Sequence, residues 1–276
     1  MKLQFAIVDG VRKLPAKGNV GQCPNCGEAV IAKCGNQRIH HWAHKSTRAC
    51  DAWWENETQW HIDWKNRFPS DWHEISQTDQ SGERHIADIK RPDGFVVEFQ
   101  HSHISDEERR KREEFYGTMV WIVDGTRLKR SVSEFQEVLT NARLVIKTPP
   151  TFQVAIDESS LIKKWITSDK VVYFDFGDVE IASDKVGYDN NSIVWRLDPS
   201  STDYQAFLTP LFKTRLVSDI QSTGMMQPST SGIFQRLPQH KRQLFNTVRP
   251  TMPPQPLRGF ERYLAAKQRR RSRIRL

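Results

Sequence analysis

The chain has 276 residues, 41 lysines and arginines against 33 acidic residues, and 37% hydrophobic content, so it is long enough to bury a core of its own. This composition, with 14 glycines and 14 prolines, excludes collagen-like, coiled-coil and wholly disordered proteins. Apolar runs stay shorter than the roughly 18 to 20 residues of a membrane-spanning helix, and Asp9 and Gly10 interrupt the first one, so we expect a soluble, cytoplasmic protein without a membrane partner.

The first 50 residues contain all four cysteines and a histidine cluster. CPNCG, with Cys23 and Cys26, precedes HHWAH by a spacing that suits a tetrahedral zinc site in a cytosolic chain. The fourth ligand stays open, because His41 with His44, His40 with His44, or Cys50 in place of either histidine would each complete the set. Unliganded thiols beside polar histidines are the alternative. We predict a structural zinc on Cys23, Cys26, His41 and His44, with Cys50 as the alternative ligand.

This N-terminal segment has one strand-like run, from Leu3 to Val8, and is too short to bury much apolar surface alone. We therefore expect the zinc to stabilise a small β module over residues 1–50. Trp42, between the histidines, is expected to pack inside this module.

Residues 51–68 have a helical pattern with an apolar stripe. Its apolar positions are Trp53, Trp60, Trp64 and Phe68. Glu57, His61 and Lys65 follow each other at i,i+4 positions and form a polar stripe along the edge of the buried face. On this helix alone, an ordinary solvated stripe is the simpler interpretation.

Three strands are expected next, over residues 72–78, 84–90 and 95–100. A Pro-Asp-Gly turn centred on Asp93 would make residue numbers that sum to 186 face each other, so that Asp88 opposes Glu98. Two carboxylates about 5 Å apart repel each other unless a cation lies between them, which is the arrangement that Mg²⁺ or Mn²⁺ requires. The alternative is a hairpin with a solvated polar face.

A second helix and a fourth strand follow the hairpin. Ser105 and Glu108 read as a capping box, and Gly117 ends the helix, whose arginines and glutamates are expected to pair with each other and with water. Residues 119–123 form a short buried strand. The predicted order is therefore helix, three strands, helix, strand.

CPNCG, HWAH, the helix with Glu57-Thr58, RHIADI, EFQHSHIS and WIVDG, in this order and spacing, resemble the competence protein CoiA family over residues 1 to about 125. The resemblance implies an α/β (α+β) chain with a PD-(D/E)xK restriction-endonuclease-like core of αβββαβ order behind a zinc-stapled β module. Members of this family are linked to processing incoming DNA and promoting recombination during natural transformation.

The resemblance also assigns roles to particular residues. Asp88 is the motif aspartate, Glu98 the acidic residue of the (D/E)xK element, and Gln100 takes the place of its lysine. Glu57 matches a helix glutamate near the metal. The implied mechanism is Mg²⁺- or Mn²⁺-assisted phosphodiester hydrolysis, in which Asp88, Glu98 and the Phe99 carbonyl hold the ion, Glu57 helps, and Gln100 orients the attacking water.

Two further residues of the polar stripe have expected roles. His61 is a candidate phosphate ligand or proton donor. Lys65 is a candidate nucleic-acid contact, and either residue is expected to supply the positive charge that Gln100 lacks.

The second half is more basic and less informative. Residues 1–147 carry 22 basic and 21 acidic side chains, whereas residues 148–276 carry 19 and 12. We expect a strand at 171–176 followed by a turn at Gly177, a loop at 198–203 and a helix around 207–220. The tail is expected to attract nucleic acid by counterion release, with a solubilising tail as the alternative. Its arginines are Arg269, Arg270, Arg271, Arg273 and Arg275.

Four regions are therefore predicted: a zinc module (1–50), a PD-(D/E)xK nuclease-like domain (51–147), an accessory α/β region (148–226), and a Pro-rich linker with a basic tail (227–276). We expect a metal-dependent deoxyribonuclease that uses Mg²⁺ or Mn²⁺ with a structural Zn²⁺. Its expected partners are DNA and recombination or DNA-uptake proteins. The alternatives are a catalytically inactive nucleic-acid-binding protein and a zinc-stapled scaffold.

Overall fold

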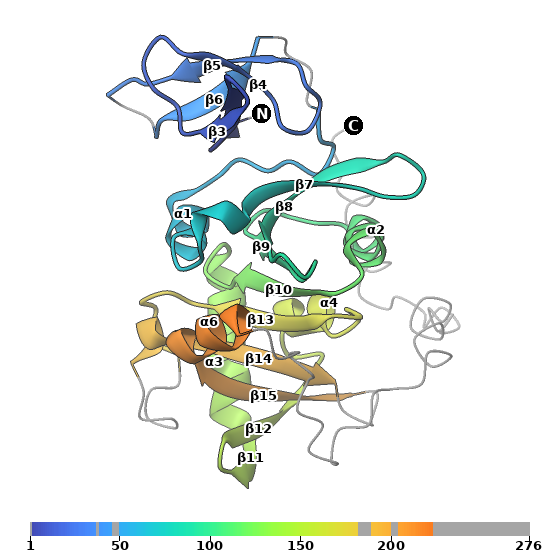
Figure 1. Ribbon diagram of the computed structural model, residues 1–276. Coiled ribbons are helices and arrows are strands. Elements are labelled where there is room, and N and C mark those ends of the chain that lie inside the picture. Colours follow the sequence, from blue (N-terminus) through green and yellow to red (C-terminus); the bar gives the residue numbers. More distant parts are fainter. Residues whose placement is uncertain (1, 37–38, 46–49, 182–188, 200–203, 223–276) are drawn as a thin grey trace, which may run out of the picture. The chain divides into compact units, whose positions relative to one another are not determined.

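The computed structural model describes residues 2–36, 39–45, 50–181, 189–199 and 204–222 (Figure 1). The predicted linker and basic tail over residues 227–276, with all five tail arginines, lie outside the described residues. Within the described ranges, no helix is both long enough and apolar enough to cross a membrane.

The N-terminal segment folds into a six-stranded antiparallel sheet with the strand order β1-β6-β5-β4-β2-β3. The strands are β1 (Lys2–Leu3), β2 (Ala6–Val8), β3 (Val11–Lys13), β4 (Val20–Gln22), β5 (Ala29–Lys33) and β6 (His41–His44). Most are too short for alternation to reveal them, which is why the sequence indicates only one strand here. The small core is centred on Trp42, which is fully buried and donates from Nε1 to the Lys13 carbonyl at 3.0 Å. The expected packing role of Trp42 is confirmed.

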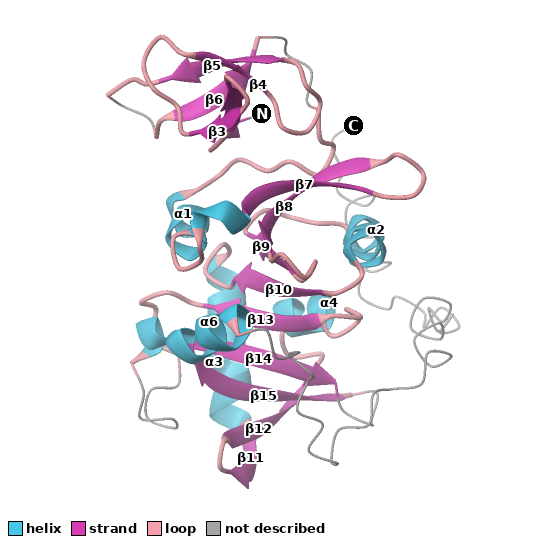
Figure 2. Ribbon diagram, viewed as in Figure 1, coloured by secondary structure: helices cyan, strands magenta, loops and turns pink. Residues whose placement is uncertain are grey.

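A nine-stranded sheet carries the rest of the described chain, in the order β11-β12-β15-β14-β13-β10-β9-β8-β7 (Figure 2). Its first elements are α1 (Gln59–Lys65), β7 (His73–Thr78), β8 (Arg84–Lys90), β9 (Val96–Gln100), α2 (Asp106–Tyr116) and β10 (Met119–Asp124). This is the αβββαβ order that the resemblance implies. Strands β9, β10 and β13 run parallel, and the other pairs are antiparallel.

The hairpin between β8 and β9 has the predicted register. Ile89 pairs with Val97 and Lys90 with Val96, so paired numbers sum to 186. A tight turn over Arg91–Gly94 sets this register. In it the Gly94 N–H donates to the Arg91 carbonyl at 2.9 Å, and Gly94 has φ +89°. The turn therefore places Asp88 opposite Glu98.

Helices cover both faces of this sheet. One apolar cluster joins Trp64 of α1 and Leu216 of α6 (Lys213–Gln221) to the face that contains Phe99. On the opposite face, α2, α3 (Lys129–Asn141) and α4 (Ser160–Trp165) pack around Trp121. The central strands are buried on both faces, as parallel strands usually are.

The helix predicted over residues 51–68 is wrong in its first half, since α1 begins only at Gln59. The Asp51 carboxylate accepts the backbone N–H groups of Trp53 and Ile86, at 2.9 and 2.8 Å, and so ties the preceding segment to β8. Thr58 then caps α1. Trp53 consequently stacks on His85 instead of joining the apolar stripe of the helix.

The second helix begins and ends where the sequence predicts. Ser105 is the N-cap of α2 and accepts the Glu108 N–H at 3.0 Å, and Gly117 is the C-cap. Its charged residues pair with each other as expected, Arg109 with Glu113 and Arg112 with Glu108. The expected contact with water is wrong for Arg109, Arg112 and Glu113, because these three side chains are buried.

The predicted domain boundary at residue 147 lies within the large sheet, which continues through the accessory region. Its further strands are β11 (Arg143–Lys147), β12 (Pro150–Ala155), β13 (Val171–Asp175), β14 (Ile193–Pro199) and β15 (Gln205–Phe212), and short 3₁₀ turns cover Ser70–Trp72 and Asn190–Ser192. The expected strand at 171–176 is confirmed. The predicted loop is wrong at Asp198 and Pro199, which pair with Phe207 and Ala206, and its other residues, 200–203, lie outside the described residues. The predicted helix starts only at Lys213, because β15 pairs with both β12 and β14.

Candidate functional site

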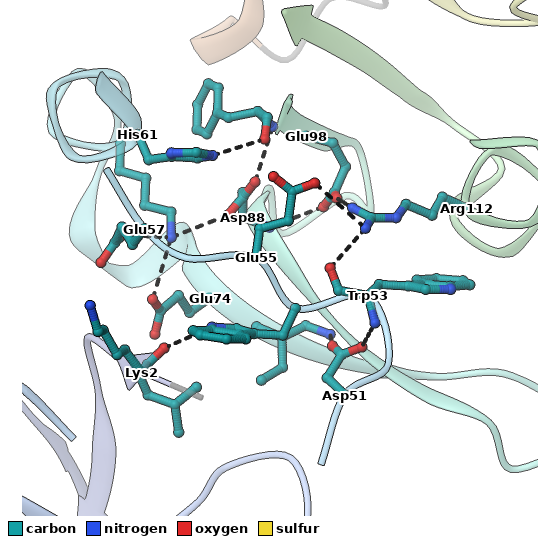
Figure 3. A pocket seen from close by; sticks show the side chains of 15 residues that line it. Lys2, Asp51, Trp53, Glu55, Glu57, His61, Glu74, Asp88, Glu98 and Arg112 are labelled. Carbon is teal, nitrogen blue, oxygen red and sulfur yellow. Dashed lines mark hydrogen bonds and ion pairs between the residues drawn. The ribbon is translucent and has the colours of Figure 1, made fainter. Parts of the chain in front are cut away.

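Two acidic side chains face each other where the β8–β9 hairpin opens (Figure 3). The Asp88 N–H donates to Glu98 Oε1 at 3.1 Å, and the Phe99 N–H donates to Asp88 Oδ2 at 3.0 Å. The two carboxylates thus accept backbone N–H groups just beyond the paired residues Ile89 and Val97 of the ladder. Their positions are fixed by the backbone of two adjacent strands.

Lys65 of α1 lies among three carboxylates and is only 4% exposed. Its Nζ contacts Glu57 at 2.9 Å, Asp88 at 3.1 Å and Glu74 at 3.3 Å. Burial opposes the charged form, but Asp88, Glu74 and Glu57 together raise the pKa of Lys65 well above its ordinary value. The ammonium is therefore a permanent positive charge inside the acidic site.

Arg112 of α2 neutralises the other side of the site. Its Nη1 donates to Glu98 Oε2 at 3.3 Å, and its Nη2 donates to the Trp53 carbonyl at 2.7 Å and to Glu108. With 4% exposure, Arg112 is held between helix, strand and the segment before α1. It positions Glu98 and carries a charge that offsets it.

The two facing acids differ in their protonation. Burial opposes ionisation of Asp88, yet the charges of Lys65 and His61 and the Phe99 N–H lower its pKa below the ordinary value. Burial and the charge of Asp88 raise the pKa of Glu98 to about 8, although Arg112 acts in the opposite sense. Without a metal, Asp88 is ionised and Glu98 is mostly protonated at neutral pH.

These side chains line a cavity of about 60 Å³, which has room for a few water molecules or a small hydrated ion (Figure 3). The N-terminal sheet contributes Lys2 and Leu3 to its wall. Two bonds hold this wall, from the Gln4 N–H to Glu74 at 2.7 Å and from Trp54 Nε1 to the Lys2 carbonyl at 3.2 Å.

A second candidate site, in the N-terminal sheet, is a cluster of three thiols and one imidazole. Its members are Cys23, Cys26, His44 and Cys50, whose ligand atoms all lie within 4.8 Å of one another. Cys23 and Cys26 flank a tight turn between β4 and β5, in which the Gly27 N–H donates to the Cys23 carbonyl at 2.9 Å. Among the described residues this is the only group of three or more such ligands close enough to hold a metal.

The donor set of this cluster fits zinc. Zn–S bonds of about 2.3 Å in a tetrahedron place two sulfur atoms about 3.8 Å apart, and the Sγ atoms of Cys23 and Cys50 lie 3.7 Å apart. A hydrogen bond from Cys50 lowers the pKa of the Cys23 thiol to about 5, which favours the thiolate that a metal binds. The four cysteines, all described, form no disulfide.

The predicted ligand His41 is not part of the cluster, and Cys50 takes its place. HWAH is a strand, so side chains alternate and His41 points to the face opposite His44. The Nδ1 of His41 contacts the Ile39 carbonyl at 2.8 Å instead. The same alternation removes the alternative of His40 and His44 on one helical face.

Two family descriptions match this chain. One is the competence protein CoiA N-terminal domain, over residues 16–52, and the other is the competence protein CoiA nuclease-like domain, over residues 57–173. Together they cover more than half of the chain. The chain belongs to the CoiA-like family.

The competence protein CoiA of Bacillus subtilis (strain 168) is 30% identical over 131 residues, which are 43% of this chain and 35% of that relative. The chain thus matches about a third of the length of this curated CoiA protein. No solved structure matches. The nuclease-like match extends to residue 173 and so reaches into β13, which agrees with the continuous sheet.

Within this CoiA nuclease-like domain, His61 has both ring nitrogens engaged. Nε2 lies 3.2 Å from the Phe99 carbonyl, the proposed metal ligand, and Nδ1 lies 2.9 Å from the Thr58 hydroxyl. Burial lowers the pKa of His61. In this structure His61 ties the start of α1 to β9, and its predicted role as a proton donor or phosphate ligand stays a prediction.

Gln100, in the lysine position of the motif, is 1% exposed. Its Nε2 donates to Glu55 and, at 3.2 Å, to the Ser102 carbonyl. Its Oε1 is buried and has no hydrogen-bond partner in the described part of the chain. The carboxamide is therefore fixed at one end and has an acceptor to offer at the other.

Lys65 does not form part of a nucleic-acid surface, because its buried ammonium faces acids. Sequence reasoning missed Glu74, Glu55 and Arg112. Extending the register argument to β7 would have found Glu74, because Ile75 pairs with Ala87 and places Glu74 opposite Asp88. No local signal marks Arg112 within its charged helix.

Proposed function

We propose that this chain is a Mg²⁺- or Mn²⁺-dependent deoxyribonuclease that hydrolyses phosphodiester bonds at Asp88 and Glu98. The observation that carries the proposal is the fixed opposition of these two carboxylates on adjacent strands, at a cavity in a nuclease-like domain. Structural zinc in the Cys/His cluster of the N-terminal sheet completes the proposal.

The residues at the cavity have the donor chemistry for a small divalent ion. Asp88, Glu98 and Glu57 offer carboxylate oxygens, the ligands that Mg²⁺ and Mn²⁺ prefer, and an ion that bound all three would draw them closer together than they are with Lys65 between Asp88 and Glu57. A buried ammonium already lies 3.1 Å from Asp88 and 2.9 Å from Glu57, which supports the view that these acids attract a cation. A bound ion would polarise the phosphodiester and lower the pKa of a bound water molecule.

The residues of the chain itself have separate tasks in this proposal. Lys65 keeps Asp88 ionised and supplies the positive charge that the motif lysine gives elsewhere. Gln100 lines the neighbouring cavity and reaches the acidic one through Glu55, which with Ser102 holds its amide nitrogen; its unpartnered Oε1 would accept a hydrogen bond from the attacking water once substrate spans the two cavities. Arg112 keeps Glu98 in place.

The biological role is proposed from the relative, whose name marks it as a competence protein. We propose that this chain processes DNA that has been taken up, in the cytoplasm, together with recombination or DNA-uptake proteins. The predicted tail arginines would add affinity for DNA that falls with salt.

The test is cleavage of labelled single-stranded and double-stranded DNA with Mg²⁺ or Mn²⁺. We compare wild type with Asp88→Asn and Glu98→Gln, and with the control Glu107→Gln, which changes an exposed acid on α2. Both site variants are expected to slow cleavage by about a thousandfold, because several kcal/mol of transition-state stabilisation are lost. The control should cleave like wild type.

Cleavage by Asp88→Asn at the wild-type rate would overturn the assignment. Wild-type protein that binds DNA equally with and without divalent ions, and never cleaves it, would favour the inactive DNA-binding protein. Magnesium is omitted from the buffer for this comparison instead of being chelated, because a chelator would also strip zinc.

A further inference from the structure

A second cavity, of about 200 Å³, lies at the carboxyl ends of the parallel strands β9 and β10. It shares no lining residue with the acidic cavity. The polar side chains on its wall that carry the argument are Gln100, His101, Asp124, Arg127, Ser131 and Lys164. The carboxyl ends of parallel strands are where open α/β sheets commonly bind ligands.

The wall of this cavity is positively charged. Arg127 is exposed and has no hydrogen bond or ion pair within the described chain, and Lys164 contributes a second cation, which donates to the Ile104 carbonyl. Asp124 is the acid among the lining residues. Its Oδ2 lies 2.7 Å from His101 Nδ1, and its Oδ1 accepts the Thr126 N–H at 2.8 Å, so both carboxylate oxygens already have partners within the protein.

Unused hydrogen-bonding groups also line this cavity. Ser131 is only 6% exposed, yet its hydroxyl has no partner among the residues that the structure describes. Ser131 belongs to the first turn of α3, which follows Leu128 and has no side-chain cap for its N–H groups. A hydroxyl at the cavity wall without a partner in the described chain, an uncapped helix start and two cations together match the donors that bind a phosphate group.

The size of the cavity limits what it can hold. Pockets that enclose drug-sized ligands measure roughly 300–1,000 Å³, so about 200 Å³ suits a phosphate group with its adjoining sugar. Trp165 and Ile104, 2% and 1% exposed, are its most buried apolar lining residues and close one side. The cavity is open to solvent on its other side, so a strand end can enter it, and its two cations suit the two negative charges of a terminal monoester.

The cavity lies next to the acidic site. Gln100 lines the cavity, while its Nε2 donates to Glu55 of the acidic site. The rings of His101 and His61 are 6.0 Å apart, and these two residues line the cavity and the acidic site respectively.

We propose that this cavity binds the terminal phosphate monoester of a DNA strand whose backbone enters the acidic site. The proposal rests on the proposed nuclease function, and it makes the enzyme one that engages phosphorylated strand ends. Arg127, Lys164 and the start of α3 contact the phosphate, and the two negative charges of a monoester distinguish it from an internal diester.

The test measures binding of the full chain to three labelled oligonucleotides, carrying a 5′-phosphate, a 3′-phosphate or hydroxyls at both ends. Ca²⁺ replaces Mg²⁺ so that binding is measured apart from cleavage. One phosphorylated oligonucleotide is expected to bind wild type about tenfold more tightly than the hydroxyl form, as charge-assisted hydrogen bonds allow. Inorganic phosphate should remove this advantage and leave the remaining affinity.

Arg127→Ala should lose the tighter binding of the phosphorylated oligonucleotide and keep the affinity for the hydroxyl form. Ser131→Ala should also reduce the preference for the phosphorylated oligonucleotide. The matched control is Lys129→Ala, which removes an exposed positive charge two residues from Arg127 that does not line the cavity. Equal binding of all three oligonucleotides by wild type, or equal losses in Arg127→Ala and Lys129→Ala, would overturn the proposal.

The two proposals fail separately. A phosphate preference that depends on Arg127, without any Mg²⁺-dependent cleavage, leaves this cavity assigned and removes the nuclease function. Cleavage that depends on Asp88, without any preference for phosphorylated ends, keeps the nuclease function and removes the assignment of this cavity.

Discussion

The two candidate metal sites of this CoiA-like chain differ in what already surrounds their ligands. In the Cys/His cluster three thiols and one imidazole, from Cys23, Cys26, Cys50 and His44, have ligand atoms that all lie within 4.8 Å of one another. At the acidic cavity the carboxylates are already bound by Lys65 and Arg112.

This difference matches the separate roles that we propose for the two sites. Thiolate and imidazole donors that lie close together suit a zinc ion that stays bound and stabilises a small sheet. Carboxylates that hold a lysine suit an ion that arrives with the substrate and leaves, because binding it requires competition with a protein cation. The following predictions test this contrast.

The largest effect is expected from the Cys/His cluster. Cys23→Ser should abolish zinc binding and unfold the N-terminal sheet, because structural zinc contributes roughly 10–16 kcal/mol of binding free energy that is coupled to folding. Zinc content measured by mass spectrometry and thermal unfolding check this. The matched control is Cys34→Ser, since Cys34 lies outside the cluster. His44→Ala should behave like Cys23→Ser, whereas zinc lost through His41→Ala would contradict the ligand set.

The next effect concerns the lysine among the acids. Lys65→Met should lower the free energy of unfolding by about 3–5 kcal/mol, because it leaves buried carboxylates without their cation. Added Mg²⁺ should restore part of this loss, since a divalent ion can take over the neutralisation. Denaturant titration measures both effects. Lys111→Met, which removes an exposed lysine, should change nothing, and a Lys65→Met protein as stable as wild type would contradict the account.

A smaller effect is expected from pH. Because the pKa of Glu98 is raised to about 8, its protonated form contributes stability that is complete below its ordinary pKa and is lost as pH rises through about 8. A divalent ion needs the ionised form, so its affinity should rise about tenfold per pH unit up to this value. Titration calorimetry at several pH values measures the slope. Glu98→Gln should remove it, and a flat wild-type profile would contradict this role of Glu98.

The smallest effect is expected from the water-orienting amide. Gln100→Ala should lower kcat about fivefold, the effect of losing one hydrogen bond, and leave the Mg²⁺ affinity unchanged. Single-turnover cleavage separates these quantities. A rise in KM with unchanged kcat would assign Gln100 to binding instead of water orientation.

The parts of this fold that local chemistry determines could be predicted from the sequence. The Pro-Asp-Gly turn fixes the hairpin register, so the opposition of Asp88 and Glu98 followed from alternation alone. Ser105 and Gly117 mark the ends of α2 for the same reason.

The rest depends on tertiary packing. Arg112 looks like any solvated arginine of a charged helix until α2 packs against the sheet and buries it. Cys50 replaces His41 because HWAH is a strand, whereas the histidine spacing suited a helix or a turn equally well. The helix prediction for residues 51–58 was wrong because the Asp51 carboxylate accepts a backbone N–H of β8, a contact that no local pattern reveals.

The most direct test of the central claim is an anomalous difference map from crystals of the full chain soaked in Mn²⁺. The account predicts a peak in contact with the carboxylates of Asp88 and Glu98, with Lys65 moved out of contact with Asp88. An empty cavity at saturating Mn²⁺, with Lys65 still bound to Asp88, would contradict it.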